Sequence, residues 1–161
     1  LAVAAVTTEG DPVHRIETVI CGGLGEIPAT SRLYEAIMTV VDGYHTGVTQ
    51  ADCFAAIHTR FNEHDGHDWC HTISNAMIVA ASLLYGEGDY GKSICMAVET
   101  GFDTDCNGAT VGSVLGMLFG RGCIGEEWAG PMKDTLHTTL FGMDTVSISE
   151  RAGMTMRHIK R

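Results

Sequence analysis

The sequence predicts an all-α protein, and three observations support this prediction. Apolar residues recur at helical spacing along most of the chain, and residues that start and stop helices separate these stretches. No useful length alternates polar and apolar residues as a half-buried strand does. The 161 residues, 45% of them hydrophobic, suffice for one domain with its own core. We therefore expect a multi-helix bundle without an internal domain boundary.

The first three helices are expected over residues 13–21, 31–42 and 50–61. Asp11, which a proline follows, is typical of a helix start, and Gly22-Gly23 should end that helix. Apolar residues at helical spacing predict the second helix, which Gly43 should stop. Thr49 is the expected N-cap of the third helix.

Three more helices are expected over residues 72–85, 90–99 and 107–119, and the first of them starts at residue 71 or 72. This first helix is apolar on nearly all sides, which is typical of a central position in the core. Residues 86–88 should end it, and Asp89 should cap the helix that follows. Residues 62–69 and 101–106 are expected to form loops.

The C-terminal part is expected to hold two further helices. Residues 120–131 contain Gly and Pro and predict an irregular stretch, and residues 132–140 favour a short helix. Glu150 stands three residues after Ser147, a capping-box pattern that predicts a last helix ending near His158.

Charge and cysteine usage exclude several classes of partner. The formal net charge of −10 argues against nucleic acid, because binding of phosphates needs clustered Lys and Arg. No apolar run reaches the roughly 18 residues of a membrane span, so we expect no membrane partner. The six cysteines show no C-x-x-C spacing, which favours reduced thiols and a cytoplasmic location.

Four glycines recur at every fourth residue, at Gly108, Gly112, Gly116 and Gly120. On a helix they would form one bare stripe. Each glycine inside a helix costs about 1 kcal/mol relative to alanine. The stripe therefore predicts that another helix or a ligand approaches this backbone closely.

Asp103 and Asp105 flank Thr104 in the loop ahead of the glycine-rich helix. In an extended loop, carboxylates two residues apart can point the same way, and they repel each other unless cations neutralise them. Mg²⁺ and Mn²⁺ favour such oxygen ligands. The alternative is that an aspartate at this place only caps the helix.

Residues 101–116, GFDTDCNGATVGSVLG, closely resemble the second metal motif of the ADP-ribosylglycohydrolase family. That motif is a G-x-D-T-D loop followed by a helix rich in Gly and Ala. Residues 27–33 look like the family's IP-x-x-S-R segment, and residues 75–90 look like its NA…LLYGEGDF segment. The resemblance runs from near the N-terminus to about His158, with these motifs in the family's order.

The resemblance implies an all-α metal-dependent hydrolase that cleaves N- or O-glycosidic ADP-ribosyl linkages. The family binds two divalent ions, usually Mg²⁺ or Mn²⁺, which hold the ribose hydroxyls of ADP-ribose and position water. Asp103 and Asp105 would then be metal ligands. Thr104 and Cys106 are further candidates for contact with the metal or its ligands. The partner would be an ADP-ribose-type small molecule or an ADP-ribosylated substrate.

The sequence departs from the family pattern in two places. Cys106 stands where the family commonly has Thr or Ser as an oxygen donor, and sulfur is a poor ligand for Mg²⁺, so the metal's identity stays open. The family's first metal motif and its N-terminal acidic catalytic residue are absent. The resemblance therefore implies that residues 1–161 are the C-terminal part of one all-α domain, which starts within a helix at Leu1. Its catalytic residues are expected N-terminal of this chain, and we expect the isolated chain to be inactive.

A histidine-rich segment contains His58, His64, His67 and His71, with acidic residues and Cys70 between them. It fits a zinc site by ligand type although not by spacing, a solvated loop, or a loop that faces substrate. His71 and Asn75 are one helical turn apart and are candidates for substrate binding. For Asn75 the alternative is a hydrogen bond within the core.

A second functional class also fits the sequence. The chain could be a non-catalytic module that binds ADP-ribose, or that binds a partner helix through the glycine stripe. An apolar surface on the helix over residues 72–85 would favour self-association.

Overall fold

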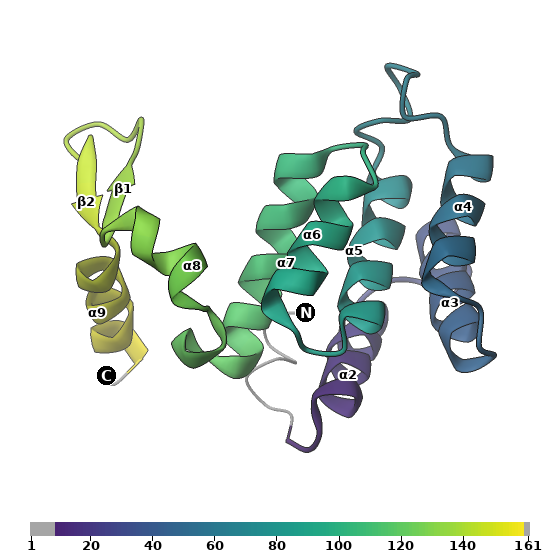
Figure 1. Ribbon diagram of the computed structural model, residues 1–161, viewed down its shortest axis with the longest axis horizontal. Helices are drawn as coiled ribbons and strands as arrows, with labels where there is room; N and C mark the ends of the chain where they lie inside the picture. The colour runs from purple at the N-terminus through teal and green to yellow at the C-terminus, as the bar shows by residue number, and fades with distance from the viewer. Residues whose placement is uncertain (1–8, 160–161) are drawn as a thin grey trace. The chain divides into compact units, whose positions relative to one another are not determined.

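The computed structural model describes residues 9–159 (Figure 1). The chain divides into two compact units, residues 1–123 and 124–161. Within the described range there are eight α-helices and one two-stranded sheet, which confirms the all-α prediction. The predicted helix cut at Leu1 lies outside the described residues, and a single domain over residues 1–161 stays a prediction.

The described part of the first unit consists of helices. All six α-helices that the sequence predicts for this part are present. Their bounds are α2 (Pro12–Leu24), α3 (Arg32–His45), α4 (Gln50–Arg60), α5 (Thr72–Gly86), α6 (Tyr90–Glu99) and α7 (Thr104–Phe119), and the short 3-10 helix η1 (Arg121–Cys123) follows.

Three predicted helix ends are wrong. α2 continues through its two glycines to Leu24, whose side chain is buried. α3 continues through Gly43 to His45, and Tyr44 in this added turn packs on the core with its ring 5.2 Å from that of Tyr85. In both helices, apolar burial beyond the glycine outweighs the cost of about 1 kcal/mol per helical glycine. α7 begins at Thr104, three residues before its predicted start.

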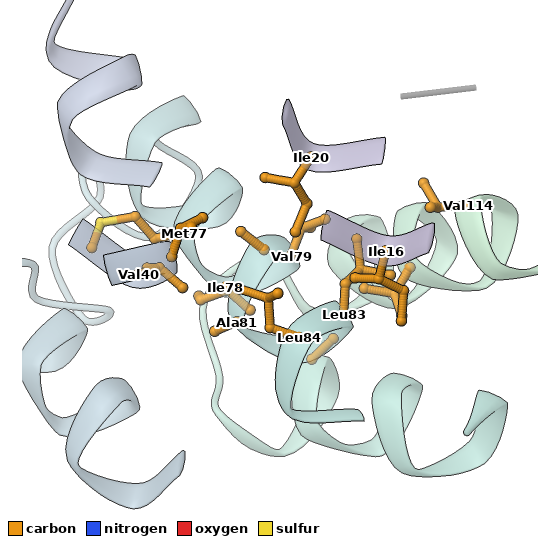
Figure 2. Close-up of a cluster of buried hydrophobic side chains, with 14 of the residues drawn as sticks. Ile16, Ile20, Val40, Met77, Ile78, Val79, Ala81, Leu83, Leu84 and Val114 are labelled. Atoms are coloured by element: carbon orange, nitrogen blue, oxygen red, sulfur yellow. The ribbon is translucent and has the colours of Figure 1, made fainter. Parts of the chain in front are cut away.

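α5 lies at the centre of the first unit, as its apolar sequence predicts. Eleven of its fifteen residues are buried, and it contacts α2, α3, α4, α6 and α7. Figure 2 shows side chains of α5 in the same buried cluster as residues of three other helices, namely Ile16, Ile20, Val40 and Val114. The labelled residues of α5 are Met77, Ile78, Val79, Ala81, Leu83 and Leu84. α6 follows α5 along the chain and runs in the opposite direction, so α5 and α7 begin at the same end of the unit (Figure 1).

α6 and α7 approach each other closely at two glycines of the predicted stripe. A Cβ at Gly108 would lie 3.1 Å from Cγ2 of Val98. A Cβ at Gly112 would lie 3.0 Å from Oη of Tyr90. The predicted close approach of another helix is therefore confirmed at these two positions. Gly120 instead follows the last residue of α7, with a φ of +76°.

The described part of the second unit mixes short helices with a hairpin. Its elements are α8 (Glu126–Ala129), the 3-10 helix η2 (Gly130–Met132), β1 (Thr135–His137), β2 (Thr145–Ser147) and α9 (Ile148–Ile159). The strands pair antiparallel, with Leu136 opposite Val146. The predicted helix over residues 132–140 is wrong, because Lys133 and Asp134 adopt positive φ values of 49° and 54° and turn the chain out of the helical conformation.

The capping signal ahead of the last helix is confirmed. The hydroxyl oxygen of Ser147 accepts a hydrogen bond from the backbone N–H of Glu150 at 3.1 Å. Elsewhere in the described residues, the six cysteines are all free thiols. No helix between residues 9 and 159 is long and apolar enough to cross a lipid bilayer.

Candidate functional site

Asp103 occupies the N-cap position of α7, but its side chain makes no capping hydrogen bond. This sets it apart from five other N-caps of the first unit. Each of those side chains accepts a hydrogen bond from a backbone N–H of the first helical turn, at Asp11, Ser31, Thr49, His71 and Asp89. The capping interpretation of Asp103 is therefore not realised, and its carboxylate is not used by the helix that it precedes.

The electrostatics at the start of α7 are those of two neighbouring carboxylates, Asp103 at the N-cap and Asp105 in the first turn rather than in the predicted loop. Loss of hydration raises the pKa of Asp103, and the adjacent Asp105 carboxylate raises it further. Asp103 is half-buried and Asp105 is exposed. Like charges held this close favour a bound proton or a cation between them.

The two carboxylates fit a hard divalent ion as part of its ligand set. Mg²⁺ usually keeps several waters and is bound through one or two carboxylates. Between residues 9 and 159, no group of three or more His, Cys, Asp or Glu side chains is placed to hold a metal ion. Asp103 and Asp105 therefore offer two oxygen donors of the right chemistry, without a third acidic, histidine or cysteine ligand. Thr104 and Cys106 lie beside them, half-buried and exposed respectively.

A cavity of about 340 Å³ opens beside Asp103 in the first unit. Its lining includes Asn75, Asp103 and Cys106, together with the apolar Val79 and Leu83 of α5. Other lining residues come from α2 and α3, namely Ile20 and Ile37. The volume lies within the range of small-molecule sites, which are mostly apolar with a few placed polar groups. Substrate-sized space therefore adjoins one of the two aspartates.

Of the two predicted substrate-binding residues, Asn75 lines the cavity and His71 caps a helix. Asn75 lines the cavity with Asp103, whereas His71 is not among the lining residues. His71 caps α5, because its Nδ1 accepts the backbone N–H of Ile73 at 3.1 Å. Its ring stacks on Phe61 with a centroid distance of 6.1 Å. No observation here tests substrate binding by either residue, so both assignments stay predictions.

The histidine-rich segment does not gather into one cluster. His67 and His71 have rings 4.9 Å apart, and Nδ1 of His67 lies 3.0 Å from Oδ1 of Asp68. The side chain of His64 is 87% exposed. His58 turns away from the others towards the loop at Thr100. This distribution matches the solvated-loop interpretation for His64 and His67.

Three side chains hold the loop of residues 100–103, which leads to Asp103 and is called the aspartate loop below. The sequence did not predict this role for any of the three. His58 contacts the carbonyl of Thr100. Oε2 of Glu63 accepts the backbone N–H of Phe102 at 3.3 Å. Asn107, which is 2% exposed, donates to the side chain of Asn75.

A sequence signal exists only for Asn107. It is a polar residue one helical turn after Asp103, on the face of α7 that also carries buried Val111. His58 and its partner Thr100 are 42 residues apart, and Glu63 and its partner Phe102 are 39 residues apart. Only the tertiary fold reveals these two contacts.

Comparison with known proteins gives one match. A family model described as ADP-ribosylglycohydrolase matches residues 1–155. No curated protein and no solved structure matches the chain. The matched range covers nearly the whole chain and includes Asp103 and Asp105 at the start of α7, the cavity and the glycine stripe.

Proposed function

Because the chain belongs to the ADP-ribosylglycohydrolase family, we propose that it functions in the metal-dependent hydrolysis of ADP-ribosyl linkages. The bond cleaved is an N- or O-glycosidic bond to ADP-ribose, and the ion is Mg²⁺ or Mn²⁺. The observation that carries the proposal is the Asp103 carboxylate. It stands at a helix N-cap without capping the helix, beside Asp105, and it lines a cavity.

The donor chemistry supports Asp103 and Asp105 as the residues that hold the ion. Loss of hydration and the neighbouring Asp105 carboxylate both raise the pKa of Asp103. A cation between the two carboxylates would remove their mutual repulsion, so the pair favours binding of the ion. Carboxylate oxygen also suits Mg²⁺ and Mn²⁺ better than the sulfur of the neighbouring Cys106. When bound, a divalent ion supplies Lewis-acid polarisation, a template for hydroxyl groups, and a lower pKa of bound water.

The cavity supports the binding of a small molecule at this place. Asp103 in its lining would bind hydroxyl groups of the ligand, either directly or through the ion. The apolar walls formed by residues such as Val79 and Leu83 would exclude water from the rest of the bound molecule. The proposal assigns no catalytic acid to any residue between 9 and 159.

Titration calorimetry with Mn²⁺ tests the proposal on the whole 161-residue chain. The wild-type chain should bind Mn²⁺, and Asp103→Asn or Asp105→Asn should abolish this binding. The matched control is Asp11→Asn, which removes the same charge from an N-cap that does bond to its helix. Wild-type protein without Mn²⁺ binding, or unchanged binding in Asp105→Asn, would contradict the metal role.

A second titration, with ADP-ribose, separates a hydrolase from a binding module. Under the proposal, ADP-ribose binds more tightly when Mn²⁺ is present, and Asp105→Asn removes this gain. In any form of the protein that releases ADP-ribose from an ADP-ribosylated substrate, Asp105→Asn should abolish this release. ADP-ribose binding that is the same with and without Mn²⁺, and in Asp105→Asn, would instead identify a non-catalytic module.

A further inference from the structure

We propose that Asn75 is a positioning residue, whose side-chain amide fixes the backbone that presents the Asp103 carboxylate. The inference rests on the proposed function in one respect, the role of Asp103 as a metal ligand. The contacts that support it do not depend on a metal.

The amide of Asn75 uses its full hydrogen-bonding capacity on protein atoms. Its Oδ1 accepts the backbone N–H of Asp103 at 3.3 Å and Nδ2 of Asn107 at 2.6 Å. Its Nδ2 donates to the carbonyl oxygens of Trp69 at 3.0 Å and His71 at 3.1 Å. A side-chain amide has two donor hydrogens and an oxygen with two lone pairs, so none of this capacity is left over.

The orientation of this amide follows from its partners. The backbone N–H of Asp103 can only donate, and the carbonyl oxygens of Trp69 and His71 can only accept. A flipped amide would set its Nδ2 against a donor and its Oδ1 against two acceptors. The bond from Oδ1 of Asn75 to Asp103 is therefore required by the surroundings.

Asn75 and Asn107 together hold Asp103 at both of its backbone polar groups. Asn75 accepts the N–H of Asp103, and the backbone N–H of Asn107 donates to the carbonyl of Asp103 at 2.9 Å. The side chain of Asn107 then returns to Asn75 and closes the link between α5 and α7. Because Asn107 is 2% exposed, water cannot readily replace this link.

The loop needs this support because its backbone is unfavourable on its own. Phe102, directly ahead of Asp103, has a φ of +60°, and Gly101 has a φ of +84°. A bulky residue at positive φ persists only where the surrounding structure fixes it. Removing the hydrogen bond between Asn75 and the Asp103 N–H should let the loop adopt other conformations. In these conformations the Asp103 carboxylate would no longer lie next to that of Asp105.

The test uses Asn75→Ala in the whole chain and two measurements. Without metal, hydrogen exchange followed by NMR should show the N–H of Asp103 exchanging about 10-fold faster, as expected for the loss of one hydrogen bond. Exchange in the middle of α6 should change less. With metal, Mn²⁺ affinity should fall by about 10- to 100-fold, as is typical when a group that orients a ligand is lost.

Ser74→Ala is the matched control. Ser74 precedes Asn75 on α5, is fully buried, and donates to the carbonyls of Asp68 and His71 at 2.9 Å each. This variant should lose stability without a selective change at Asp103. Equal effects of the two variants, or an unchanged Asp103 in Asn75→Ala, would overturn the inference.

Two further outcomes keep the inference decidable. If Asn75→Ala does not fold, Asn107→Ala takes its place, because it removes the other side chain of the hydrogen bond between the two asparagines. This variant should also speed exchange of the Asp103 N–H. Unchanged exchange there would overturn the inference. If the wild-type chain binds no Mn²⁺, the metal part of the proposed function fails. The exchange measurement then still decides whether Asn75 positions Asp103.

Discussion

The Nε2 atom of His58 lies 2.9 Å from the carbonyl oxygen of Thr100 and 3.2 Å from the Thr100 hydroxyl. The His58 ring also lies 5.0 Å from that of Phe102. These contacts fasten the last turn of α4 to the aspartate loop. The histidine in this position supports the loop structurally, and among residues 9–159 it belongs to no group of three or more potential metal ligands.

Replacing His58 by Ala should lower the free energy of unfolding by about 0.5–1.5 kcal/mol, the usual net contribution of one hydrogen bond. The loss in the free energy of unfolding should come mainly from this hydrogen bond, because His58 is exposed at the surface. Urea denaturation measures it. His64→Ala is the control, since the side chain of His64 is 87% exposed and the change should be within experimental error. Equal destabilisation by both substitutions would contradict the assigned support role.

Gly86→Ala should destabilise the protein by about 1–3 kcal/mol, the usual cost of overpacking a core. A Cβ at Gly86 would lie 2.8 Å from Cβ of Ser93 and 3.2 Å from its Cα, so the α5 and α6 backbones would have to separate. Thermal unfolding measures the loss. Gly66→Ala serves as the control, because nothing lies within 4 Å of a Cβ there, and its stability should be unchanged or slightly higher. A neutral Gly86→Ala would show that the two helices are not packed as described.

Asp103→Asn should stabilise the metal-free protein while it abolishes metal binding. The pKa of Asp103 is raised in the folded state, so folding favours its protonated form, and ionisation at neutral pH reduces stability. The gain should be at most about 1 kcal/mol, since solvent screens a half-exposed pair.

The pH dependence gives a second check on the sign of this effect. Below the ordinary aspartate pKa of about 3.9 the two proteins should be equally stable, because Asp103 is protonated in both states. The difference should appear as pH rises through the raised pKa and stay constant above it. Unfolding measured from pH 3 to pH 8 decides this. If Asp103→Asn is less stable than wild type at pH 7 without metal, the conclusion that ionisation of Asp103 beside Asp105 is unfavourable is wrong.

Asp134 should make the junction between the hairpin and α9 sensitive to acid. Hydrogen bonds from the hydroxyls of Ser147 and Ser149, at 2.6 and 2.7 Å, and from the backbone N–H of Ser149 hold the pKa of Asp134 below its usual range. The stabilisation is present above the ordinary aspartate pKa and is lost as pH falls through the lowered value. Protection of the Ser149 N–H, followed by NMR from pH 6 to pH 2, should decrease over this interval.

Asp134→Asn should remove this acid transition, and Asp144→Asn in the same hairpin should leave it in place. The comparison isolates the contacts of one carboxylate, because both substitutions remove one negative charge from the second unit. Retention of the full transition in Asp134→Asn would refute the assignment.

Much of the helical architecture could be predicted because its signals are local. Asp11, Thr49 and Asp89 cap the helices that they were expected to cap, since each side chain reaches an N–H only three residues away. Helix ends at glycine were harder to predict. Whether α2 stops at its glycines or continues to bury Leu24 depends on the core that the other helices provide for that side chain, and this is not a local property.

The hairpin was missed for a related reason. Its two strands are three residues long each, too short for a period of two to show, and the turn into β1 relies on positive φ at two non-glycine residues. Asp134 compensates for part of this conformation through its bonds to Ser147 and Ser149, which are 13 and 15 residues away.

Short-range spacing and residue type were enough to predict the all-α class, the family, and the aspartate pair as the chemically distinctive segment. That Asp103 does not cap its helix, that a cavity adjoins it, and that Asn75 and Asn107 hold its backbone became visible only in the folded chain. These contacts could not be predicted because their partners lie far apart along the chain. Asn75 and Asn107 are separated by 32 residues, and their contact exists only because α6 returns the chain and brings the starts of α5 and α7 together.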